Sequence, residues 1–118
     1  MGDVMDIKLN ITFKHDGIIE INEFDGTFID NRIVYNDDVR VIIDLDKKKI
    51  ERISDDYKVE LDFINDICRI YVKELDNYLN LNMIKEKYEH NNNLLNIVYY
   101  IENEKENKIE YNITYKNM

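Results

Sequence analysis

The chain has no alanine, proline, tryptophan or glutamine, and its 118 residues include one serine and one cysteine. Alanine is the best helix former, so its absence weakens any prediction of helix. A lone Cys68 cannot form an internal disulfide, which is typical of proteins from a reducing compartment. The sequence has no apolar run of the length needed for a signal peptide or a membrane span. We therefore expect a cytoplasmic protein.

Positive charge is in short supply: 16 lysines and arginines face 25 aspartates and glutamates, for a net charge of −9 at pH 7. A charge of this sign repels phosphate backbones and anionic lipids. We therefore expect no nucleic-acid partner and no membrane partner. The length is typical of one domain, and we expect residues 1–118 to form a single one.

Residues that favour β-strands are abundant, including 19 isoleucines and nine tyrosines. Apolar and polar residues alternate over Met5–Phe13 and again over Ile109–Tyr115, so each segment predicts a strand with one apolar face. Similar segments lie between them, separated by polar turns at intervals of about eight to twelve residues. The segment from Leu75 to His90 also admits a helix, but its helical apolar stripe ends after one turn, so we predict a strand there. The whole pattern is typical of an antiparallel sandwich or barrel.

Two Asp-Gly pairs mark changes of direction. Asp16 and Gly17 follow the first alternating segment, where Asp-Gly suits the positive φ angles of a tight hairpin. Asp25 and Gly26 interrupt the second segment, and we expect a bend or a bulge at this point.

Several short motifs resemble those of the YwiB-like proteins, a small bacterial family. They are Gly26, "RIVY" ending at Tyr35, "KKKIERISDD" with Arg52 inside it, "VELDF", "LNLNM", and the closing "LNIVYYIENE" and "IEYNITYK". The resemblance covers about residues 5–116. It implies an all-β, antiparallel, up-and-down barrel of the calycin or lipocalin type with about eight to ten strands. It implies no particular activity.

Residues that often carry catalysis lie in unsuitable surroundings. Ser54 is flanked by Asp55 and Asp56 in a predicted turn, without the glycines that hold a nucleophilic serine on a strained elbow. Cys68 lies mid-strand among isoleucines, where a thiol usually acts as a small buried hydrophobe. We therefore predict no enzyme activity and no catalytic residue.

Metal ligation is not predicted either. His15 and His90 stand alone in predicted loops, without a second ligand at a metal-binding spacing. Asp44 and Asp46 begin like a calcium-binding loop, but three lysines follow where more oxygen ligands and a glycine are required. We predict no metal and no cofactor.

The tyrosine-rich strands raise the question of a ligand cavity. A barrel of about eight strands is just wide enough to be filled by side chains or to hold one small ligand. Large inward side chains favour a filled barrel, yet Tyr99, Tyr111 and Tyr115 carry hydroxyls that need partners when buried. An inward-pointing Arg52 would likewise need an acid or an anionic ligand. We predict that these four residues line a site for a small, partly apolar ligand at one barrel mouth.

A second function stays open beside this one. The segments Ile67–Val72 and Leu94–Tyr100 are apolar on both faces, and both faces then need cover. A solid barrel acting as a protein-interaction module or as a homodimer would supply that cover.

Overall fold

Ten strands make up almost all of the regular structure. The computed structural model describes residues 4–118. The strands are β1 (Met5–His15), β2 (Ile18–Ile29), β3 (Arg32–Asp37), β4 (Val39–Asp44), β5 (Lys49–Ile53), β6 (Tyr57–Asp62), β7 (Ile67–Val72), β8 (Asn77–Asn91), β9 (Leu94–Ile101) and β10 (Ile109–Asn117). A single 3-10 turn, η1 (Lys73–Leu75), is the helical element of the described residues. Within them we find no helix with the length and apolar character to cross a bilayer. The predicted all-β chain is confirmed, including a strand rather than a helix before His90.

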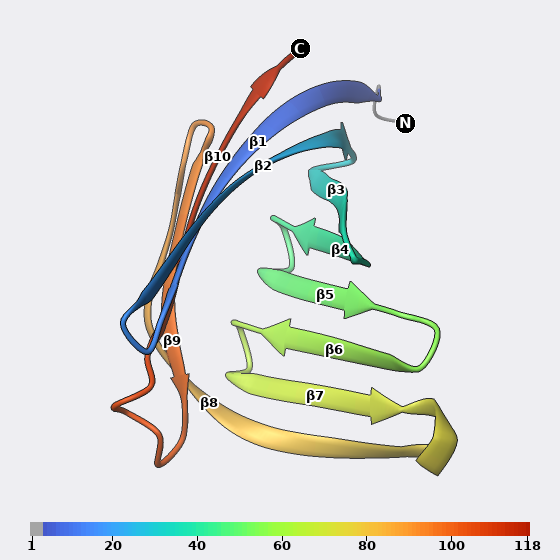
Figure 1. Cartoon of the computed structure of the whole chain (residues 1–118), viewed down its shortest axis with the longest axis vertical. Helices are drawn as coiled ribbons and strands as arrows, with labels where there is room; N and C mark the ends of the chain where they lie inside the picture. The colour runs from blue at the N-terminus through green and yellow to red at the C-terminus, as the bar shows by residue number, and fades with distance from the viewer. Residues whose placement is uncertain (1–3) are drawn as a thin grey trace.

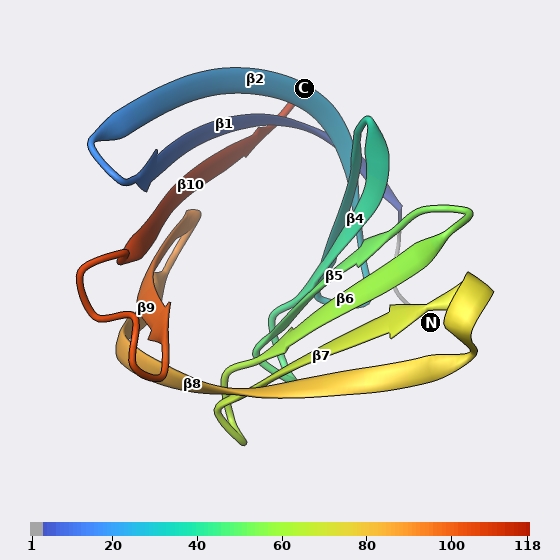
Figure 2. The same cartoon turned by 60° about the horizontal axis from the view of Figure 1, so that its bottom comes forward.

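The sheet closes on itself. Each strand pairs antiparallel with the next one along the chain, and β1 pairs with β10. The closing pair runs without a register shift from Ile7 opposite Asn117 to His15 opposite Ile109. Figures 1 and 2 show the resulting enclosure, with β1, β9 and β10 facing β4–β7. The fold is a closed, ten-stranded, up-and-down antiparallel barrel, as predicted.

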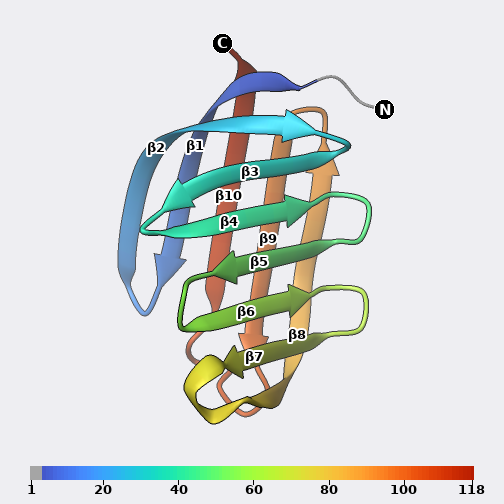
Figure 3. The same ribbon diagram turned by 90° about the vertical axis from the view of Figure 1, so that its right-hand side faces the viewer.

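Two long strands join the crossing layers of this barrel. In Figure 3 the short strands β3–β7 run across the front, and β1, β9 and β10 cross behind them. β8 pairs with β7 through Asn77–Asn82 and with β9 through Met83–Asn91. β2 pairs with β1 along most of its length, but with β3 only through Gly26–Ile29. The edge of β2 over residues 18–25 therefore has no second strand beside it in the part of the chain that the structure describes.

The sequence suggested a bend or a bulge at Gly26, but Gly26 lies inside the continuous strand β2, and the bulge lies elsewhere. β2 pairs with β1 through Gly26 without a shift in register. The irregularity lies in β8, where the pairing with β9 shifts register between Lys85 and Lys87. Met83 and Tyr88 are five residues apart and would face opposite sides of a regular strand. The extra residue turns both side chains toward the core.

Repeated hairpin turns close one end of the barrel. Three apolar residues at this end are buried: Leu45 directly after β4, Phe63 directly after β6, and Met83 in β8. Their backbone N–H groups donate in turn to the carbonyls of Asn31, Lys48 and Asp66, at 3.0, 2.9 and 2.9 Å. All three acceptor residues have positive φ angles. Figure 3 shows the β4–β5 and β6–β7 turns on one side of the front layer, opposite the first half of β2. An open mouth of the barrel can therefore lie only at the opposite end, near the first half of β2.

Gly26 pairs with both β1 and β3 and is closely surrounded. A Cβ atom at this position would lie 2.9 Å from Leu9 Cδ1 and 2.9 Å from the carbonyl oxygen of Val34. Since the carbonyl belongs to the backbone, it cannot move aside by a change of rotamer. We expect Gly26→Ala to lower the free energy of unfolding by about 1–2 kcal/mol, the lower part of the range for overpacking. Urea denaturation measures this loss.

Gly17 offers a matched control, because a Cβ there would meet no atom within 4 Å. Its φ angle of +76° is one that asparagine tolerates. Gly17→Asn should change the unfolding free energy by less than about 0.5 kcal/mol. Equal losses in the two variants would show that close approach is not what selects glycine at position 26.

Candidate ligand-binding site

Side chains fill the middle of the barrel. Nine large residues are less than 2% exposed: Phe63, Ile7, Leu9, Ile33, Ile43, Leu95, Ile97, Ile113 and Val41. They come from both layers and form one continuous core. A ligand site must therefore lie at the mouth rather than at the centre.

A pocket of about 290 Å³ opens at this mouth, beside the free edge of β2. Its apolar lining comes from Ile11, Phe13 and Phe24. The other lining residues carry polar groups: Glu20, Asn22, Tyr35, Asp37, Arg52 and Tyr111. The volume lies just below the range of about 300–1,000 Å³ for small-molecule sites. The pocket therefore suits a ligand of one or two rings.

The pairing register explains why Arg52 points into the barrel. Arg52 on β5 lies directly opposite Val41 on β4 and Val59 on β6. Residues that are directly opposite share a face of the sheet, and Val41 is fully buried in the core. Arg52 is thus the polar member of an otherwise apolar inward row.

Asp37 is the ionic partner of Arg52, but the contact is long. Arg52 Nη2 lies 3.8 Å from Asp37 Oδ2, with the two side chains 31% and 42% exposed. Partly exposed pairs of this kind contribute little to stability. The guanidinium has five N–H donors, and the described residues give it no acceptor within hydrogen-bond distance. Arg52 is therefore free to donate to a bound molecule.

Three tyrosine hydroxyls also lack partners. Tyr35 and Tyr99 are 5% and 4% exposed, and the described residues offer no hydrogen bond to their hydroxyls or to that of Tyr111. Burial raises the pKa of all three hydroxyls above its ordinary value, and the nearby charge of Arg52 opposes this rise. The hydroxyls stay protonated at neutral pH and can donate a hydrogen bond.

Aromatic rings surround these polar groups. The ring centroids of Phe13 and Tyr111 are 5.0 Å apart, and those of Phe24 and Tyr35 are also 5.0 Å apart. Tyr99 lies nearly parallel to Tyr111, at 6.5 Å and an interplanar angle of 10°. The arrangement presents flat apolar surfaces beside hydrogen-bond donors.

The structure brings three of the four predicted ligand residues together. Arg52 and Tyr111 line the pocket, and Tyr99 packs against Tyr111. Tyr115 lies elsewhere: its hydroxyl is 3.1 Å from His90 Nε2 and donates to the Asn92 carbonyl oxygen at 3.2 Å. Tyr111 and Tyr115 share a strand face, but four residues of extended chain separate them by about 13 Å.

Sequence reasoning missed the contribution of β2. Glu20 and Asn22 point into the pocket because they lie opposite Phe13 and Ile11 on β1. In this half of β2 the polar residues therefore face inward, and Ile19 and Ile21 face outward. Tyr35 and Asp37 on β3 were also missed, since a short strand gives little evidence of which face is inside.

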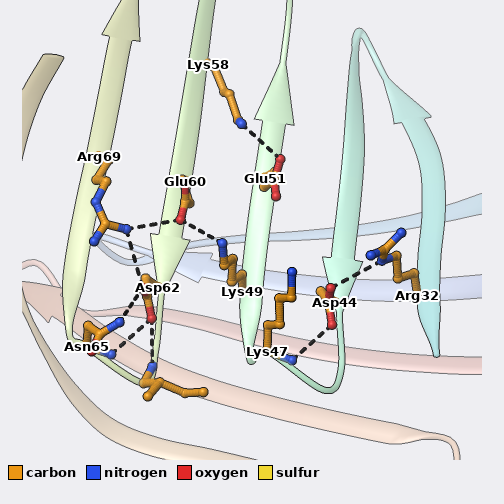
Figure 4. Close-up of polar contacts among 11 residues, drawn as sticks. Arg32, Asp44, Lys47, Lys49, Glu51, Lys58, Glu60, Asp62, Asn65 and Arg69 are labelled. Carbon is orange, nitrogen blue, oxygen red and sulfur yellow. Dashed lines mark hydrogen bonds and ion pairs between the residues drawn. The ribbon is translucent and has the colours of Figure 1, made fainter. Parts of the chain in front are cut away.

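The outer face of β3–β7 is charged, and several of its charges pair with one another. Figure 4 shows Glu60 between Lys49 and Arg69, at 3.0 and 3.1 Å. Arg32 similarly pairs with Asp44 at 3.2 Å. These ion pairs form a network along this face.

The remaining residues that could carry catalysis or bind a metal have structural roles or lack suitable partners. Cys68 is buried, and burial raises the pKa of its thiol, so it stays protonated. The Ser54 hydroxyl accepts hydrogen bonds from the backbone N–H groups of Asp56 and Tyr57, as in a turn. Over residues 4–118 no group of three His, Cys, Asp or Glu side chains could hold a metal ion.

The architecture and the pocket define the protein as a closed up-and-down β-barrel with one small polar-aromatic mouth, an arrangement consistent with a calycin-like barrel. The crystal structure of the ywiB protein from Bacillus subtilis has a similar fold, with a TM-score of 0.52 and 14% sequence identity. The alignment covers 99% of this chain and 93% of that one. No protein-family model and no curated protein matches the sequence. At this identity the similarity establishes the fold alone.

Proposed function

We propose that this barrel binds a small, partly apolar molecule at its mouth and catalyses no reaction. Support comes from Arg52, Tyr35 and Tyr111, which direct donors toward one pocket without hydrogen-bond partners. These donor atoms are reachable from solvent rather than sealed in the core, so a ligand that enters the mouth could accept hydrogen bonds from them. We also place the chain in the YwiB-like family, on the shared motifs and the shared fold, and in the cytoplasm, on its single unpaired cysteine.

A fragment library of small aromatic and aliphatic compounds, screened by ligand-observed NMR, tests this proposal. We expect binders with one or two rings. Arg52→Ala should weaken them at least tenfold, which corresponds to about 1.4 kcal/mol, because it removes the strongest donor. The half-exposed position of Arg52 makes unfolding of this variant unexpected.

Arg40→Ala is the matched control for this experiment. Arg40 is exposed and precedes the inward-facing Val41, so it lies on the outer face of β4. The fragments should bind this variant as they bind the wild-type protein. A library without binders, or binders that ignore Arg52, would contradict the proposed function.

Exposed isoleucines on β2 favour a second candidate, a homodimer or protein-interaction module. Ile18, Ile19 and Ile21 are 60%, 62% and 73% exposed, next to the unpaired edge of β2. Such an edge is a template for pairing with another strand. The strands that suggested this function from sequence, β7 and β9, expose one large apolar side chain, Leu94 at 44%. The interaction surface would therefore be β2.

Analytical ultracentrifugation separates this candidate from the first. A dimer formed through β2 should dissociate in the Ile21→Lys variant, which places a charge on the exposed strand. The variant should fold normally, because Ile21 packs against little. A strict monomer at millimolar concentration of wild-type protein would exclude the homodimer.

A further inference from the structure

We propose that the ligand is a flat, uncharged heterocycle with a hydrogen-bond acceptor and a donor side by side on one edge, as in a purine or pyrimidine with a ring amide. The inference rests on the proposed binding function and names its ligand class. The observation that carries it is the adjacency of Arg52 and Asp37 among aromatic rings at the pocket.

Arg52 and Asp37 provide complementary hydrogen-bonding groups. The guanidinium only donates, and the ionised carboxylate only accepts. The two groups are 3.8 Å apart, too far for a good hydrogen bond to each other. The carbonyl oxygen of a ring amide could accept from Arg52 while the neighbouring ring N–H donates to Asp37. A planar amide edge thus fits both groups at once.

The walls of the pocket favour a flat molecule. Phe13 and Tyr111 form one aromatic pair, and Phe24 and Tyr35 form another, each with ring centroids 5.0 Å apart. Aromatic rings prefer offset or edge-to-face contact with other rings. A cavity of about 290 Å³ has room for a fused bicycle but not for a long chain.

Charge argues against an anionic ligand. The pocket contains one cation, Arg52, and two carboxylates, Asp37 and Glu20. A carboxylate or phosphate group would share Arg52 with Asp37 and be repelled by Glu20. The net charge of −9 on the chain adds to this repulsion at low ionic strength. A neutral ligand is not repelled by these carboxylates, and it can still form hydrogen bonds with both Arg52 and Asp37.

Titration calorimetry with three soluble bicycles tests the inference. Hypoxanthine has the ring-amide edge, 9-methylpurine has the same rings without any N–H donor, and indole-2-carboxylate replaces the edge with an anion. We expect hypoxanthine to bind at least tenfold more tightly than 9-methylpurine. Indole-2-carboxylate should bind least of the three to the wild-type protein.

The variant Asp37→Ala makes the test independent of damage to the fold. It removes the acceptor for the ring N–H and leaves Arg52 without its ionic partner. Hypoxanthine should therefore bind at least tenfold more weakly, and indole-2-carboxylate at least tenfold more tightly. A misfolded pocket would weaken both. Asp38→Asn, at the exposed neighbouring position outside the pocket, should change neither affinity.

The outcomes separate this inference from the proposed function. If indole-2-carboxylate binds wild-type protein more tightly than hypoxanthine, the ligand class is wrong and the binding function stands. If fragments from the library bind while hypoxanthine does not, the same conclusion follows. If no compound binds, both proposals fail.

Discussion

Replacing Phe63 with alanine should lower the free energy of unfolding by about 3–5 kcal/mol, the usual cost of deleting a buried aromatic side chain. Phe63 is fully buried, and its ring centroid lies 5.4 Å from that of Tyr99 and 5.6 Å from that of Tyr88. The neighbours come from β8 and β9, and their pairing with other strands prevents collapse into the space. Much of the total stability of a domain of this size would be lost.

Urea denaturation of Phe63→Ala and of Ile64→Ala measures this effect. Ile64 is the next residue of the same turn, and it is 57% exposed. Ile64→Ala should cost less than about 1 kcal/mol. If the two variants lost equal stability, Phe63 would not seal the closed end of the barrel as described.

Asp62→Ala should have the next largest effect, a loss of about 2–3 kcal/mol. Asp62 Oδ1 accepts hydrogen bonds from the backbone N–H groups of Ile64 and Asn65, at 3.1 and 3.0 Å. Oδ2 accepts from the Asn65 side chain at 2.9 Å and from Arg69 at 3.4 Å (Figure 4). Hydrogen bonds to a charged group contribute about 1.5–3 kcal/mol each. Partial access of water to the donors reduces their sum.

The pH dependence of stability checks that the charged form of Asp62 is responsible. Burial acts to raise the pKa of this carboxyl, but its hydrogen bonds outweigh burial and lower the pKa overall. Asp44 caps the β4–β5 turn in the same way, and its pKa is also lowered. A lowered pKa in the folded state gives stability that is present above the unfolded value of about 3.9 and is lost as pH falls through the folded value.

Urea midpoints measured across the acid range therefore distinguish Asp62→Ala from wild type. The stability difference should be full at neutral pH and shrink below about pH 4. Asp55→Ala, at an exposed turn position, should match wild type at every pH. A difference for Asp62→Ala that stays constant down to low pH would mean that the carboxylate charge plays no part.

The strands could be predicted from the sequence because the alternation of apolar and polar residues is visible within each short segment. The alternation over Met5–Phe13 and Ile109–Tyr115 indicated two strands and the faces they bury, and the structure pairs them with each other. Antiparallel pairing followed from turns too short for any parallel crossover, whereas the closed barrel was an expectation from the family resemblance.

It was harder to predict which face of a strand points inward where the register with a neighbouring strand decides this. Glu20 and Asn22 face the pocket because β1 fixes the register of β2, against the hydrophobic preference of Ile19 and Ile21. No local signal marks the register shift in β8 next to Glu86. These features depend on partners far away in the sequence.

The same reason explains why the structure brings only some of the four predicted ligand residues together. Arg52 was considered because an inward-pointing charge would need an acid or an anionic ligand, and Tyr111 because its strand alternates clearly. Tyr115 shares the alternation, but periodicity does not tell which end of a barrel a residue occupies. The position of Tyr115 near His90 required the structure.

Chemical-shift mapping on isotope-labelled protein tests most directly whether the mouth pocket is the ligand site. Hypoxanthine, or the best library fragment, would be titrated while the backbone and the Arg52 side chain are observed. We predict shifts confined to the pocket, with the largest at Arg52, Asn22 and Tyr111. Shifts centred on Tyr115 and His90, or none at saturating ligand, would contradict the account.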